Sequence, residues 1–217
     1  SYYYYEGKVK KLTRKSHLPK LLSDICSKVF SNTPIITNET INKNYLSSGT
    51  INSRAKVIKG ILSPELEPML GLLKTSQDAA IARSLLKETG IIENIEEKPK
   101  VLKDIADDNI LNILTIINNY ILSSEKEEQN LSRLYFQLTS PVNGIGLKKG
   151  VIPVFIAIVI RNYMNNISIF YNNLEMEINE KLLTDINESP ENYTLKLESL
   201  TEEKKEYIKT LIMSLWK

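Results

Sequence analysis

A glycine-rich loop precedes the most apolar segment of the chain and has residue types that phosphate binding uses. Gly144, Gly146 and Gly150 follow the spacing G-x-G-x-x-x-G, with Lys148 and Lys149 inside the loop. Glycines allow backbone N–H groups to approach a phosphate at the start of a helix. The spacing matches neither the P-loop G-x-x-x-x-G-K-[ST] nor the dinucleotide-binding G-x-G-x-x-G. We therefore expect a turn that leads into a helix rather than a phosphate site.

Two further groups of residues have side chains that metal binding or catalysis could use. Asp104, Asp107 and Asp108 share one surface if this segment is helical, and carboxylates at this spacing can hold a divalent cation. Their place near the start of the helix favours a simpler role, which is attraction to the positive end of the helix dipole. His17 is the only histidine and has no nucleophile motif beside it. We expect no catalytic triad, no metal site and no cofactor.

The N-terminal part of the chain is strongly basic. Residues 1–60 contain 11 Lys and Arg against three acidic residues, a net charge of +8, whereas residues 61–217 carry −6. A basic segment of this kind can bind a polyanion or an acidic protein surface, and the simpler alternative is a solvated face. The candidate nucleic-acid contacts are Lys8, Lys10, Lys11, Arg14, Lys15, Lys148 and Lys149.

The periodicity of apolar residues predicts that most of the chain is helical. Helices are expected near residues 18–30, 51–61, 77–89, 101–122, 125–138, 151–164 and 201–216. Short β-structure is expected at three places, which are the aromatic stretch around Gly7, the hairpin pattern of residues 167–178 and the segment 191–199. We therefore predict a mainly α fold, a helical bundle with a C-terminal winged-helix-like subdomain that carries a small β-hairpin.

The polar stretch around Pro99 is the predicted boundary between two subdomains. Residues 1–98 would form a basic helical subdomain with a short N-terminal strand. Residues 99–217 would form a helical subdomain with the β-hairpin. The chain opens on Ser1 and four tyrosines instead of Met, which suggests an excerpt from a longer protein.

The apolar residues predict which side chains form the core, and the single cysteine predicts the cellular compartment. Ile152, Phe155, Ile156 and Val159 form one helical face and should be buried, and the run around them is about half as long as a membrane span. Cys26 lies on the apolar face of the helix near residues 18–30 and is expected to pack there. A single cysteine cannot form an internal disulfide, so we expect a reducing, cytoplasmic location and no membrane partner.

Three stretches together resemble one protein family. They are "TPIITNETINKNYLSSGTINSRAKVIKGIL", "GIGLKKGVIPVFIA", and "IFYNNLEMEI" followed by "SPENYTL". They resemble parts of the large P-loop ATPases of bacterial phage-defence systems, of the BREX type and relatives. No Walker motif lies within the chain, so the resemblance implies a non-Walker, helical and winged-helix-like region. The resemblance marks as interaction or structural residues Asn38, Glu39, Asn42, Arg54, Gly146, Gly150, Pro153 and Tyr171.

The resemblance implies a non-catalytic accessory region that docks to the motor domain of the parent ATPase or to a subunit of the defence complex. The alternative is a nucleic-acid-binding module that uses the basic N-terminal half and the winged-helix-like end, with DNA as its partner.

Arg54 would lie in the first turn of a helix beginning near Thr50, where the dipole disfavours a cation. We therefore expect an ion pair between Arg54 and Glu39 that holds the intervening loop and presents Asn42 and Ser47 outward.

Overall fold

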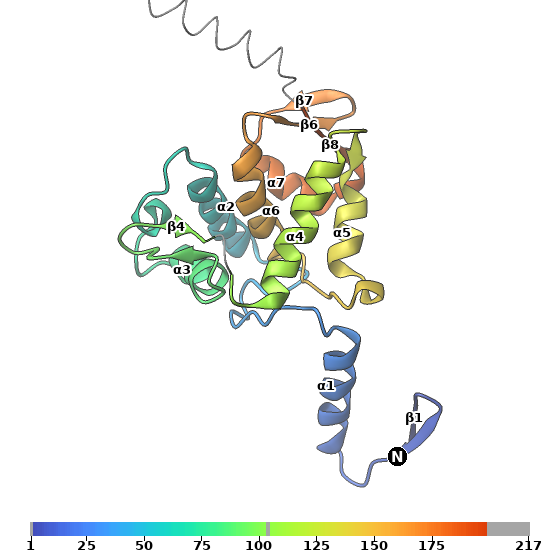
Figure 1. Ribbon diagram of the computed structural model, residues 1–217. Helices are drawn as coiled ribbons and strands as arrows, with labels where there is room; N and C mark the ends of the chain where they lie inside the picture. The colour runs from blue at the N-terminus through green and yellow to red at the C-terminus, as the bar shows by residue number, and fades with distance from the viewer. Residues whose placement is uncertain (1, 103–104, 199–217) are drawn as a thin grey trace, which may run out of the picture.

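The computed structural model describes residues 2–102 and 105–198 of the 217-residue chain. They form a body of mixed α/β structure and an N-terminal arm that projects from one end of it (Figure 1). The helix predicted near residues 201–216 lies outside the described residues.

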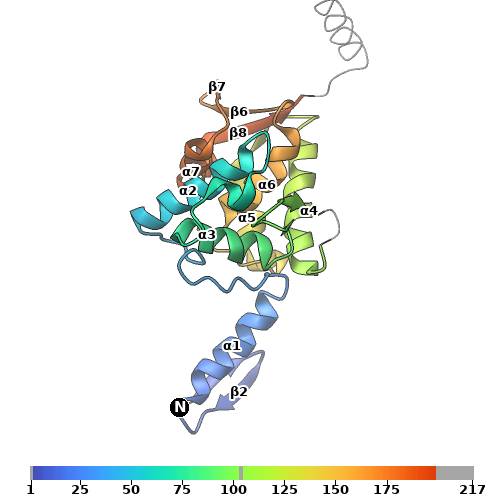
Figure 2. The ribbon, with the colours of Figure 1, turned by 90° about the vertical axis from the view of Figure 1, so that its left-hand side faces the viewer.

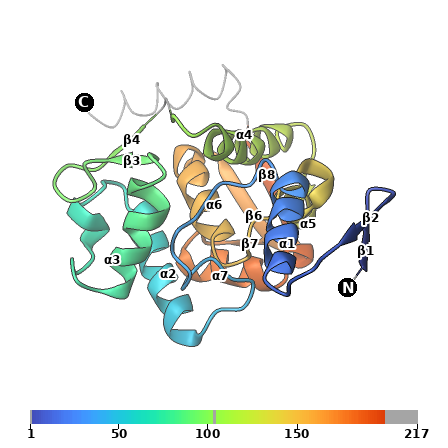
Figure 3. The same ribbon diagram turned by 90° about the horizontal axis from the view of Figure 1, so that it is seen from below.

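The arm, residues 2–29, consists of a β-hairpin and one helix. Strands β1 (Tyr2–Tyr5) and β2 (Lys8–Lys11) pair antiparallel, as the aromatic stretch predicted, and helix α1 spans His17–Val29. The arm lies below the body in Figures 1 and 2, and Figure 3 shows β1 and β2 beyond the edge of the body. No residue of α1 is buried, and Cys26 is exposed, so its predicted packing is wrong. An apolar face in the sequence does not ensure that another element covers it.

The helices of the body begin at polar side chains that cap them, except α6, which follows Val151 and has no side-chain cap. Their bounds are α2 (Ser48–Leu62), α3 (Gln77–Ala82), α4 (Asp108–Ser123), α5 (Leu131–Thr139), α6 (Ile152–Ile160) and α7 (Glu180–Glu188). A π-helical turn at Arg83–Lys87 continues α3, in agreement with the predicted helix at 77–89. Short 3-10 turns lie at Pro68–Gly71, Pro141–Asn143, Arg161–Tyr163 and Pro190–Asn192.

Two predicted helices begin later than expected. The helix predicted from residue 101 begins at residue 108, because the Asp107 carboxylate accepts the N–H groups of Asn109 and Ile110 and caps it there. The helix predicted from residue 125 begins at residue 131 behind the Asn130 cap. Short strands occupy part of the sequence in which the helices were predicted to begin. Strand β4 (Lys100–Val101) pairs with β3 (Ile92–Glu93), and β5 (Gln129–Asn130) joins the main sheet.

The main sheet overturns the predicted helical bundle with its winged-helix-like subdomain. It contains β5, β6 (Ile167–Tyr171), β7 (Leu174–Met176) and β8 (Tyr193–Leu197) in the antiparallel order β5-β8-β6-β7. The predicted hairpin is present as β6 and β7, and the strand predicted in segment 191–199 is β8. However, β8 follows α7 and inserts between β5 and β6, which produces a sheet rather than an isolated wing. The fold is therefore mixed α/β.

Helix α6 forms the centre of the core. All nine of its residues are buried, which confirms the predicted burial of Ile152, Phe155, Ile156 and Val159. It packs against α2, α4 and α7 (Figure 1). Buried side chains from both sides of residue 98 belong to one continuous core. In the described part of the chain, no helix combines the length and apolar character that crossing a bilayer requires.

Candidate functional site

Two segments far apart in the sequence lie side by side between the arm and the body. We call residues 30–44 and 143–150 the loop junction. The Asn32 N–H donates to the Gly144 carbonyl (3.0 Å), the Gly146 N–H to the Thr33 hydroxyl (2.8 Å) and the Gly150 N–H to the Lys43 carbonyl (2.9 Å). Two of the stretches that carry the family resemblance therefore meet in space.

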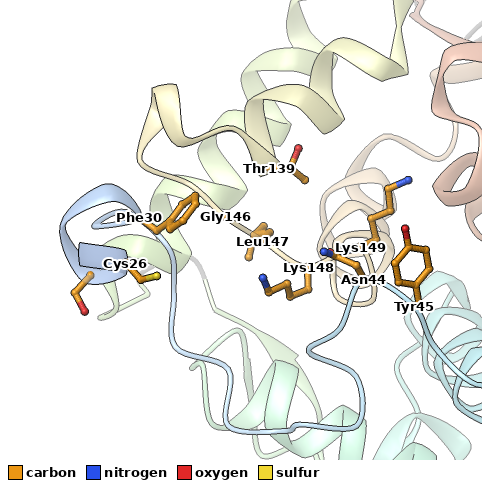
Figure 4. Close-up of a pocket in the computed structure, with 10 residues that line it drawn as sticks. Cys26, Phe30, Asn44, Tyr45, Thr139, Gly146, Leu147, Lys148 and Lys149 are labelled. Atoms are coloured by element: carbon orange, nitrogen blue, oxygen red, sulfur yellow. Dashed lines mark hydrogen bonds between the residues drawn. The ribbon is translucent and has the colours of Figure 1, made fainter. Parts of the chain in front are cut away.

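Gly146 and Gly150 allow the closest approaches in the loop junction. A Cβ atom on Gly146 would lie 2.6 Å from the Phe30 ring, and Figure 4 shows Phe30 beside this glycine. A Cβ atom on Gly150 would lie 2.0 Å from the Ile41 carbonyl oxygen. Pro153 is in the first turn of α6, where a missing N–H costs nothing. The predicted turn into a helix is confirmed, and its glycines serve chain packing.

Asn38 and Asn42 stabilise their own loop. The Asn38 side chain accepts the Thr40 N–H (3.0 Å), and its carbonyl accepts the Asn42 N–H (3.0 Å). The Asn42 amide donates to the Ile36 carbonyl (3.2 Å) and is half-buried, so its predicted outward presentation is wrong. Glu39 is exposed on this loop.

Arg54 is buried, with 1% of its surface exposed. Its Nη1 donates to the Gly150 carbonyl (3.3 Å), while Nε and Nη2 have no hydrogen-bond partner among the described residues. The predicted ion pair with Glu39 is therefore wrong. Burial lowers the pKa of the Arg54 guanidinium, and Tyr135 and Glu188 partly offset this effect. Because α2 begins at Ser48, Arg54 lies in its second turn and contacts the loop ahead of α6.

A basic cleft opens between the end of α1 and the loop junction (Figure 4). Its volume is about 550 Å³, and it is lined by Cys26, Ser27, Phe30, Asn44, Tyr45, Thr139 and residues 146–149. Lys148 is exposed and Lys149 is half-buried, and Tyr45 on the rim is 92% exposed. The sequence interpretation included both lysines but missed Tyr45. A lone aromatic residue in a polar loop was the available signal.

The other candidate basic residues lie on the arm. All three lysines of β2 are exposed, as are Arg14 and Lys15. Helix α1 has 13 residues, so it is about 20 Å long. Arg14 precedes the start of this helix, whereas the basic cleft lies at its other end. The basic residues therefore form two groups at one end of the molecule rather than one compact site.

The arm hairpin exposes aromatic rings among these lysines. Tyr2 and Tyr4 are 70% and 76% exposed, and the Lys11 ammonium lies 5.8 Å from the centre of the Tyr2 ring. On the opposite face, the Lys28 ammonium of α1 lies 6.0 Å from the Tyr5 ring. One face of the hairpin thus leans on α1, while the other presents Tyr2 and Tyr4 to solvent.

No family model, curated protein or solved structure matches this chain.

Two other groups singled out in the sequence lie apart from the loop junction. Tyr171 is on β6, with its ring centre 5.1 Å from that of Tyr193, and the sheet lies at the end opposite the arm (Figures 1 and 2). Asp107 caps α4 and Asp108 lies in its first turn, as the dipole interpretation predicted, while Asp104 is outside the described residues. The described residues contain no group of three or more His, Cys, Asp and Glu that could hold a metal ion.

Proposed function

We propose that this chain is a non-catalytic interaction module that docks on a partner protein through its N-terminal arm. The observation that supports this most is that α1 buries no side chain, although Leu18, Leu21, Leu22 and Ile25 form an apolar stripe along it. A helix of this length is marginal in water and normally gains its stability by burying such a stripe.

The hairpin of the arm supports the same proposal. An isolated two-stranded hairpin is also marginally stable, and this one covers α1 only in part: Leu21 and Ile25 are half-buried, and Leu22 remains 51% exposed. A partner that covers the stripe would stabilise both elements of the arm. The family resemblance suggests which partner this is, namely the motor domain or another subunit of a phage-defence P-loop ATPase.

Site-specific photo-crosslinking in the natural gene product tests this proposal. A photoreactive residue replaces Leu22 in one variant and Val142, which is 83% exposed on the body, in the control variant. We expect Leu22 to crosslink in high yield to one segment of one protein, and Val142 to give only weak, scattered products. Equal crosslinking from the two positions would refute docking through α1.

Nucleic-acid binding is the second candidate, supported by the exposed lysines and tyrosines of the hairpin. Basic side chains neutralise phosphates, and aromatic rings stack on unpaired bases. The test is fluorescence anisotropy of labelled duplex and single-stranded DNA at about 50 and 200 mM salt. Replacing Lys8, Lys10 and Lys11 by Gln should reduce the duplex salt slope by about 2.7, which is ~0.9 for each lost phosphate contact. An unchanged slope would exclude the hairpin as the binding surface.

A further inference from the structure

The Arg54 guanidinium is an unusual group for the interior of this protein. Arg54 is 1% exposed, and its one hydrogen bond to the described residues runs from Nη1 to the Gly150 carbonyl. Nε and Nη2 are buried and have no acceptor in the described part of the chain. A guanidinium is permanently charged, and leaving its donors unpaired in the interior is strongly unfavourable. Two donors of Arg54 therefore lack the acceptor that would compensate for their burial among the described residues.

The two unpaired atoms are adjacent on the guanidinium. Nε and Nη2 form one side of its planar fork, and two parallel N–H groups of this kind bind two oxygens of a phosphate or carboxylate at once. The bond from Nη1 to the Gly150 carbonyl uses a different nitrogen and leaves this side of the fork intact.

Arg54 lines a small pocket at the edge of the loop junction. Its volume is about 190 Å³, and it is lined by Asn44, Tyr45, Leu46, Ile51, Arg54, Lys149, Asn187 and Glu188. A water needs about 10–15 Å³ of such space, so the pocket is large enough for a small tetrahedral anion. Tyr45 and Glu188 are exposed, so these rim side chains can rotate away from the guanidinium, whereas the Asn44 side-chain oxygen accepts the Lys149 N–H (3.2 Å).

The charges that line this pocket favour an anion. Arg54 and Lys149 contribute two positive charges, and Glu188 contributes one negative charge. The Asn187 side-chain oxygen already accepts the Tyr135 hydroxyl (3.2 Å), so Asn187 does not compete for the guanidinium through that bond. Glu188 is the internal competitor, since its carboxylate is exposed and can compete with a bound anion for Arg54.

We propose that the pocket between α2, the loop junction and the end of α7 binds a phosphate group, with Arg54 as the buried fork and Lys149 as the second cation. Phosphate fits this arrangement because it offers enough oxygens to accept from the fork and from Lys149 together. The group is either free phosphate or the terminal phosphate of a larger molecule. This site is separate from the apolar stripe of α1 and does not depend on docking through the arm.

Isothermal titration calorimetry with inorganic phosphate in low-salt buffer tests the site. We expect one saturable site with a dissociation constant on the order of 1 mM, typical of a very small ligand. Acetate should bind at least several-fold more weakly. Absence of saturable phosphate binding, or acetate binding as strong as that of phosphate, would overturn the assignment. A phosphomonoester titrated in parallel identifies the source: binding equal to that of phosphate indicates a terminal phosphate group, and no binding indicates the free ion.

Two neighbouring lysines provide matched variants that keep Arg54 and its bond to Gly150. Both lysines line the basic cleft, whereas Lys149 and not Lys148 lines the pocket. Lys149→Gln should weaken phosphate binding by about tenfold, the effect of one charge-assisted hydrogen bond, and Lys148→Gln should change it less than about twofold. Glu188→Gln should strengthen binding, because it removes the competing carboxylate. Equal weakening by both lysine variants would show a general surface effect and overturn the proposal.

Discussion

Replacing Gly150 by Ala should separate the two halves of the loop junction. The new Cβ would lie 2.0 Å from the Ile41 carbonyl oxygen, whereas side-chain carbons stay at least 3.0 Å from such atoms. One segment must therefore move by about 1 Å, a distance estimated from this contact. That shift would break the bond from the Gly150 N–H to Lys43 and the bond from Arg54 to the Gly150 carbonyl, now 2.9 and 3.3 Å long.

The expected cost follows from these two bonds. A neutral hydrogen bond contributes about 1 kcal/mol and one to a charged group about 2 kcal/mol. With the strain of imperfect relaxation added, the free energy of unfolding should fall by ~3–5 kcal/mol. For a chain of 217 residues this corresponds to a loss of roughly 10 °C in Tm.

Urea denaturation followed by circular dichroism measures this effect, with Gly49→Ala as the matched control. A Cβ on Gly49 would lie 4.0 Å from the Ser47 hydroxyl, an ordinary contact, and Gly49 is in the first turn of α2. Alanine is favoured over glycine in helices, so the control should be neutral or stabilising by up to about 1 kcal/mol. A Gly150→Ala protein within about 0.5 kcal/mol of the wild type would refute the close contact at the junction.

Three further predictions concern the core, alkaline stability and the hairpin. Phe155→Ala should destabilise the protein by ~3–5 kcal/mol in the same assay, and the control Phe136→Ala, at a residue 62% exposed, by less than about 0.5 kcal/mol. Burial raises the pKa of Tyr120 to about 12, so ionisation of the unfolded tyrosine from about pH 10 should lower the stability of the wild type between pH 10 and 12. Tyr120→Phe should lose less stability across that window, and identical pH profiles would contradict this assignment. If the hairpin stacks on bases, Tyr2→Ala with Tyr4→Ala should weaken single-stranded DNA binding by ~1–3 kcal/mol per base while leaving duplex binding nearly unchanged.

Local patterns predicted the elements whose structure depends on neighbouring residues. The β6–β7 hairpin follows from alternating apolar residues around Asn172 and Asn173, which both adopt the positive φ that a two-residue turn needs. The apolar run of α6 predicted its own burial because almost no polar face interrupts it. Caps were harder to place, since the helical periodicity extended over the residues ahead of Asp107 and Asn130, where short strands and loops lie.

Long-range features were not predictable in the same way. The acceptor for Arg54 is the Gly150 carbonyl, 96 residues further along the chain, whereas the sequence offered Glu39 as a nearby acid. The insertion of β8 between β5 and β6 depends on where α7 directs the chain, and no local spacing encodes it. The exposure of Cys26 depends on what packs along α1, which its own amphipathic pattern does not specify.

The loop junction also affects when this chain can fold during synthesis. Its hydrogen bonds join residues 105 to 113 positions apart, as between Asn44 and Lys149 or Thr33 and Gly146. Because the ribosome adds about 5–20 residues per second, residues 143–150 are synthesised roughly 5–20 s after residues 30–44. During that time the groups of residues 30–44 that later pair with residues 143–150 stay hydrogen-bonded to water, because loop closure over such a separation must precede docking. The arm is therefore synthesised before the segment that it meets at the loop junction, and the junction forms only after residues 143–150 have been synthesised.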